Sequence, residues 1–139
     1  MTDDVQAEYA RLYGGPGDQS PIRHDEFAAP HGAFVVLEVE GRAVAMGGWR
    51  RGGPGGEGDA EIKRMYVRPA HRGRGLSRRV LAELERSAAA AGVERLVLET
   101  GLAQPEAIAL YRSSGYTDVE PFGFYQDSPL SVHLGKRLA

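Results

Sequence analysis

The sequence predicts an α/β fold in which helices pack on a mixed, mostly antiparallel sheet. Runs rich in β-branched and aromatic residues are separated by turn residues, an apolar stripe recurs at helical spacing, and glycines follow two predicted helices. The predicted order is helix, three strands, helix, strand, helix and two strands. Hairpin-linked strands followed by alternating strands and helices indicate a mixed sheet with helices packed on it.

The first half of the chain contains the predicted hairpin. Residues 4–13 have helical spacing, and a short helix is compatible with residues 24–28. Three strands are predicted at residues 33–39, 43–51 and 60–67. Glu40, Gly41 and Arg42 form the turn between the first two, and the third should stop near Pro69, which lacks an N–H.

The second half alternates between helices and strands. One apolar helical stripe consists of Leu76, Val80, Leu81, Leu84, Ala88 and Ala91. Gly92 is placed to end that helix, and Gly115 follows a second helix at residues 105–113. Strands are expected at residues 95–100, 116–119 and 131–137.

Length and composition indicate a single domain, residues 1–139, of a cytoplasmic protein. The chain has 139 residues, no cysteine and a formal net charge of −2. We therefore expect no thiol nucleophile, disulfide or nucleic-acid partner. Neither a signal peptide nor an apolar run of about 20 residues is present, so no membrane association is expected. No metal-ligand spacing occurs, so no metal is expected either.

A basic cluster marks one end of the longer predicted helix. Eight cations and no acidic residue lie within seventeen positions, namely Lys63, Arg64, Arg68, His71, Arg72, Arg74, Arg78 and Arg79. Helix N-termini normally favour acidic residues, so this arrangement indicates a bound anion. Gly73 and Gly75 lack a Cβ, which allows backbone N–H groups to approach phosphate oxygens.

Two common phosphate-binding fingerprints fit this turn poorly. A dinucleotide fingerprint requires glycine where Arg78 stands, and no Walker run occurs. A nucleotide-binding module is therefore the least favoured function.

The turn resembles the pyrophosphate loop of the GNAT acetyltransferase superfamily. Arg72-Gly73-Arg74-Gly75-Leu76-Ser77 is similar to the pattern [Q/R]-x-x-G-x-[G/A], with Ser77 as the departure. Residues 61–69 resemble the cofactor-binding strand of the family. Residues 104–116 resemble its N-x-x-A-x-x-L-Y-x-x-x-G-[F/Y] segment, with Gln104 in place of Asn. The resemblance covers residues 33–138 and implies a GNAT-like fold.

The resemblance implies that acetyl-CoA is the co-substrate and that an amine attacks its thioester directly. Cofactor-binding roles are implied for Met65, Tyr66, Val67, Arg72, Gly73, Arg74, Gly75, Leu76, Ser77 and Gln104. The strand next to the cofactor is expected to splay, so that the Met65 N–H faces the acetyl carbonyl while Val67 pairs with the pantetheine amides.

Three side chains are candidates for proton transfer. Tyr111 matches the family tyrosine near the cofactor sulfur, where a protonated phenol could donate to the leaving thiolate. Glu61 matches a catalytic glutamate of several members, whereas Glu99 on the next strand could equally be the base or hold the substrate ammonium. The sequence leaves this choice open.

The acceptor is the least determined part of the hypothesis. A small-molecule amine is expected, with a protein amine, another acyl-CoA or a non-catalytic acyl-CoA sensor as alternatives. Phe122, Phe124 and Tyr125 either wall the acceptor pocket or belong to a satellite core. His24, His31 and His133 have no assigned role. A homodimer is compatible with the sequence, which sets no oligomeric state.

Overall fold

The computed structural model describes residues 27, 28, 30–123 and 125–138. The predicted helix at residues 4–13 and most of the short one at 24–28 lie outside the described residues. The strands are β1 (Gly32–Val39), β2 (Arg42–Arg51), β3 (Asp59–Val67), β4 (Arg95–Gly101), β5 (Thr117–Asp118) and β6 (Ser131–Arg137). The helices are α2 (Leu76–Ala90) and α3 (Pro105–Ser113), with short 3₁₀ turns η2 (Gly56–Gly58) and η3 (Pro69–His71). The predicted order is confirmed for the described part of the chain.

The strands form one mixed sheet in the order β1-β2-β3-β4-β6-β5. Only β3 and β4 are parallel, because α2 connects them as a crossover; all other neighbours are antiparallel. At the β1–β2 hairpin, Glu40 and Gly41 both have positive φ, 53° and 79°. Two such residues form the turn whose twist matches that of the strands.

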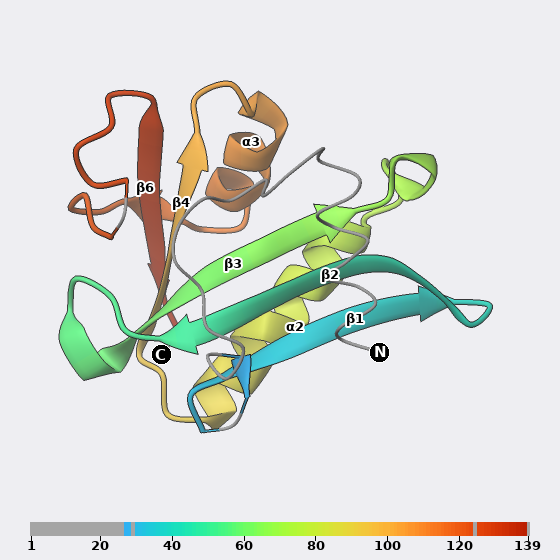
Figure 1. Cartoon of the computed structure of the whole chain (residues 1–139), viewed down its shortest axis with the longest axis horizontal. Helices are drawn as coiled ribbons and strands as arrows, with labels where there is room; N and C mark the ends of the chain where they lie inside the picture. The colour runs from blue at the N-terminus through green and yellow to red at the C-terminus, as the bar shows by residue number, and fades with distance from the viewer. Residues whose placement is uncertain (1–26, 29, 124, 139) are drawn as a thin grey trace.

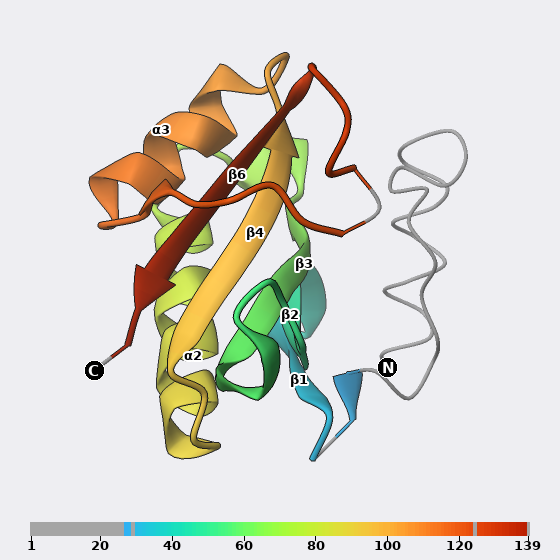
Figure 2. The ribbon, with the colours of Figure 1, turned by 90° about the vertical axis from the view of Figure 1, so that its left-hand side faces the viewer.

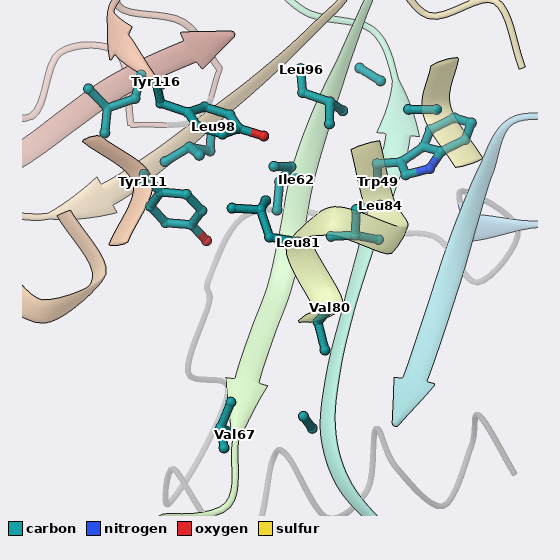
Figure 3. Close-up of a cluster of buried hydrophobic side chains, with 14 of the residues drawn as sticks. Trp49, Ile62, Val67, Val80, Leu81, Leu84, Leu96, Leu98, Tyr111 and Tyr116 are labelled. Carbon is teal, nitrogen blue, oxygen red and sulfur yellow. The ribbon is translucent and has the colours of Figure 1, made fainter. Parts of the chain in front are cut away.

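Both of the described helices, α2 and α3, cover the same face of the sheet (Figure 2). The predicted stripe of α2 is buried at Leu76, Val80, Leu81, Leu84 and Ala88. Ala91, the last predicted member, is exposed because α2 ends at Ala90. The side chains of α2 and the sheet form one core (Figure 3), to which Trp49 Nε1 adds a 3.0 Å hydrogen bond to Ser87 Oγ.

The parallel pair in the middle of the sheet is short. β3 and β4 pair only at Asp59 with Arg95, Ala60 with Leu96 and Glu61 with Val97. Beyond these residues the two strands diverge (Figure 1). Residues 62–67 of β3 therefore have a strand neighbour on the β2 side alone, within the part of the chain that the structure describes.

A β-bulge lies on β3 where the strands diverge. The register with β2 shifts between Met46 and Gly48, and Arg64 in the bulge has a φ of 62°. A positive φ at a non-glycine residue is strained and often occurs at functional sites. At Gly47, an added Cβ would lie 2.5 Å from Met65 Sδ and 3.0 Å from Val80 Cγ1, so α2 packs closely against the bulge.

Candidate active site

The glycine turn forms the N-terminus of α2, as predicted. Gly73 and Gly75 have φ values of 80° and 75°, and the space above both glycines is open. Gly75 is the N-cap residue, no side chain caps the helix, and no acidic residue lies in its first turn. The first N–H groups of α2 therefore remain available to an anion.

Arg72 attaches this turn to β3. Its Nε donates a 3.1 Å hydrogen bond to the carbonyl oxygen of Val67, and its guanidinium lies 5.7 Å from the ring centroid of Tyr66. Three residues predicted to bind the cofactor thus form one connected unit. Of the other members of the predicted loop, Arg74 is exposed, Ser77 is half-buried and Leu76 is buried in the core.

A cavity of about 180 Å³ lies between the diverging strands. It is lined from β3 by Ile62, Lys63, Arg64 and Met65; from β4 by Leu98, Glu99, Thr100 and Gly101; and from later segments by Gln104, Ala107, Tyr111 and Tyr125. Four residues with predicted cofactor-binding or catalytic roles therefore meet here: Met65, Glu99, Gln104 and Tyr111. Gln104 is exposed and is the N-cap residue of α3.

Tyr111 extends from α3 toward β3 (Figure 3) and is 6% exposed. Its ring packs edge-on against Tyr116, with a centroid distance of 5.6 Å. Burial raises the pKa of the Tyr111 phenol well above its usual range. Tyr111 is therefore protonated at neutral pH and can act as a donor.

The two candidate bases differ in their surroundings. Glu99 lines the cavity, whereas Glu61 is not among the lining residues. The Glu61 carboxylate accepts hydrogen bonds of 3.0 and 3.3 Å from Arg50, its register partner on β2, and Lys63 Nζ lies 3.8 Å from it. Glu61 is thus held in an ion-pair network at the junction of β2 and β3.

The segment before β6 contributes two aromatic residues. Tyr125 lines the cavity, while Phe122 is buried with its ring centroid 5.1 Å from that of His133. Both expected roles, pocket wall and satellite core, are thus represented. Phe124 lies outside the described residues.

Lys63 and Arg64 are lining residues that the sequence hypothesis treated only as members of a basic cluster. Their placement depends on the bulge of β3, for which the sequence carries no recognisable signal. Neither described helix is long and apolar enough to cross a membrane.

The chain is similar to known proteins in sequence and in fold. Residues 2–116 match the model of the Acetyltransferase (GNAT) family. An IAA acetyltransferase of Azospirillum brasilense is 43% identical over 111 residues, covering 80% of this chain and 71% of the relative. The N-alpha-acetyltransferase RimI of Mycobacterium tuberculosis is 35% identical over 111 residues, 79% of this chain and 68% of that protein.

Solved structures show the same fold. A crystal structure from Klebsiella pneumoniae, provisionally described as an acyl-CoA N-acyltransferase, has a TM-score of 0.78 and 34% identity, covering 96% of this chain and 89% of its own. A PaiA N-acetyltransferase of Thermoplasma acidophilum, solved with coenzyme A, has a TM-score of 0.66 at 13% identity. The match covers 77% of this chain and 61% of that chain. At that identity the likeness concerns the fold alone.

Proposed function

The chain belongs to the GNAT family of acetyl-CoA-dependent N-acetyltransferases, and from that premise we propose that it acetylates a primary amine on a small molecule. The observation that carries the proposal is the cavity between β3 and β4. Glu99 lines it from β4 and Tyr111 from α3, so a proton acceptor and a proton donor flank one space. Direct attack of an amine on a thioester requires both groups.

In the proposed reaction, Glu99 accepts a proton from the acceptor ammonium, and the free amine attacks the thioester carbonyl. The Met65 N–H stabilises the resulting oxyanion. Tyr111 then donates its proton to the departing thiolate, and the resulting phenolate takes the remaining extra proton from the nitrogen of the new amide. Glu61 is assigned a structural role, because Arg50 and Lys63 already engage its carboxylate.

The glycine turn is proposed to bind the pyrophosphate of acetyl-CoA. Open space above Gly73 and Gly75 and the uncapped first turn of α2 fit a phosphate group closely approached by backbone N–H donors. Arg74 and Ser77 are available to add side-chain contacts. Arg72 connects the glycine turn to β3, through its hydrogen bond to Val67 and its contact with the ring of Tyr66. The proposed cofactor-binding residues therefore continue from the turn along β3 toward the cavity.

The cavity volume and one relative favour a small acceptor. A volume of about 180 Å³ is enough for a compact amine. The relative at 43% identity is named for a small-molecule activity. RimI, at 35% identity, is named for N-alpha acetylation and makes a peptide amine the second candidate.

Thiol release from acetyl-CoA tests the proposal with three sets of acceptors: small primary amines, peptides with free N-termini, and no acceptor. Acceleration by a small amine, with the N-acetyl product identified by mass spectrometry, is the expected result. Acceleration by peptides alone would contradict the small-acceptor proposal. Tight acetyl-CoA binding without acceleration by any acceptor would favour the non-catalytic sensor. Replacing acetyl-CoA with propionyl- or succinyl-CoA then determines the preferred acyl group.

A further inference from the structure

His133 lies beside the proposed base. On β6 it is the register partner of Glu99 on β4. Directly opposite residues of an antiparallel pair project from the same face, with Cβ atoms about 4.5–5.5 Å apart. Glu99 lines the cavity and His133 does not, so His133 lies on the next strand of the sheet, on the side of Glu99 away from the cavity.

The imidazole of His133 is buried and unsatisfied. His133 is 7% exposed, and neither Nδ1 nor Nε2 makes a well-formed hydrogen bond within the described residues, although the Tyr125 backbone lies close enough to act on the imidazole. The imidazole packs against the ring of Phe122, but this contact provides no hydrogen bond to either nitrogen. Burying two polar atoms in this way costs free energy that an apolar side chain would avoid. A structural role alone therefore accounts poorly for histidine at this position.

The surroundings of His133 keep it neutral near pH 7. Burial lowers the pKa of the imidazole, while the Tyr125 backbone and the charge of Glu61 oppose that shift. The charged groups near it are Glu99 on β4 and Glu61 on β3, and the backbone of Tyr125 approaches it from the segment before β6. A neutral imidazole has one nitrogen that accepts a proton and one that donates.

We propose that His133 is a proton-relay and positioning residue that acts through Glu99. The inference rests on the proposed function, in which Glu99 is the base. Glu99 takes a proton as an N–H bond of the acceptor ammonium breaks and an O–H bond forms. The proton then passes from the carboxylic acid through one water to the nitrogen of His133 that carries no proton. This transfer restores the carboxylate, and the imidazolium releases the proton to solvent after the acetylated product leaves.

Three variants test the relay. His133→Gln removes the titrating ring, His133→Phe retains a ring against Phe122, and His31→Gln is the control, since His31 is exposed before β1. We expect kcat to fall about 10²-fold in both His133 variants, the typical scale of general acid–base contributions. The KM for acetyl-CoA should not change, and His31→Gln should behave as wild type. The thermal transition of His133→Phe shows whether the variant is folded.

The pH profile distinguishes a relay from a packing role. In wild type, kcat should decline toward acidic pH as His133 becomes protonated, and this limb should move in His133→Gln but not in His31→Gln. Side-chain NMR titration provides a readout independent of turnover: the pKa of His133 should fall further in Glu99→Gln, because a nearby negative charge has been removed. An unchanged His133 pKa in that variant, or full kcat with an unaltered pH profile in folded His133→Phe, overturns the relay.

Failure of the inference is distinguishable from failure of the proposed function. If wild-type protein acetylates amines and the His133 variants match it, only the relay is wrong. If wild-type protein acetylates no amine, the proposed function itself is wrong.

Discussion

Arg95 at the start of β4 holds the carboxylate of Asp59 at the start of β3 through two hydrogen bonds, of 2.9 and 2.7 Å. These two residues are also the first of the three register pairs that join the strands. The Gly55 N–H donates a further 2.6 Å bond to Asp59. The ion pair thus fixes the closed end of the gap that contains the cavity.

Asp59→Asn should destabilise the fold by about 3 kcal/mol, because it leaves a largely buried Arg95 with only the exposed carboxylate of Glu120, 3.3 Å away, as a charge partner. The Arg95 hydrogen bond lowers the pKa of Asp59 below its ordinary value of 3.8. The stability that Asp59 contributes is therefore present above pH 3.8 and is lost as pH falls through the lower native pKa. Urea denaturation measures the free energy of unfolding of the variant and of wild type at pH 7 and at pH 3. The difference between the two proteins should be smaller at pH 3.

Glu83→Gln is the matched control, because Glu83 pairs with Arg86 on the exposed face of α2. An exposed pair within one helix contributes little. A comparable loss of stability in both variants would contradict the role assigned to Asp59.

Gly75→Glu should abolish measurable acetyl-CoA binding, because a carboxylate would occupy the space at the N-terminus of α2 and repel phosphate. Gly92→Glu is its control: Gly92 also has a positive φ, 85°, with open space around it, but it follows the other end of α2. Both variants carry similar backbone strain, so calorimetric titration with acetyl-CoA isolates the effect at the turn. Equal affinity in the two variants would refute the proposed pyrophosphate site.

Tyr111→Phe should lower kcat by about 10²-fold while leaving the affinity for acetyl-CoA nearly unchanged, because it removes only the proton donor. Tyr116→Phe is the matched control from the same aromatic pair. The Tyr116 hydroxyl donates a 2.9 Å hydrogen bond to Glu85, so its loss should reduce stability and spare kcat. Stopped-flow and steady-state thiol release, with thermal denaturation of both variants, provide the comparison.

Glu99→Gln and Glu61→Gln should have different effects. Glu99→Gln should lower kcat/KM about 10²-fold and abolish the decline of the rate at acidic pH. Glu61→Gln should leave the rate dependent on pH and should lower the free energy of unfolding, because it removes the carboxylate that Arg50 and Lys63 approach. If the pH dependence disappears in Glu61→Gln instead, the assignments of the two glutamates must be exchanged.

The sequence predicted the element order because local patterns control it. Proline and glycine mark the ends of α3, and the bounds of α3 and β6 agree with those predicted. The third strand and the fourth each extend one residue beyond their predictions, and β5 is shorter, at two residues. Strand ends depend on partners distant in sequence, which local patterns do not encode.

The details of the cavity could not be predicted in the same way. The positive φ of Arg64 and the ion pair between Glu61 and Arg50 both depend on the register between β2 and β3. A shift of that register by one residue would reverse which side chains of β3 face the cavity. The place of His133 beside Glu99 likewise depends on how β6 pairs with β4. The proposals for Tyr111 and the glycine turn came from motif similarity, whereas the proposal of Glu99 over Glu61 depends on the cavity lining and on the ion pairs of Glu61.

The three-pair junction between β3 and β4 divides the sheet into two hydrogen-bond ladders, one on each side of the gap. The ladder with β3 leads into the glycine turn, and the ladder with β4 contributes Glu99. A ligand that contacts both ladders adds its own binding free energy to their association. Acetyl-CoA bound at the proposed site would therefore stabilise the junction between the two ladders as well as serve as the substrate. Binding of acetyl-CoA should therefore slow amide hydrogen exchange most along the facing edges of β3 and β4.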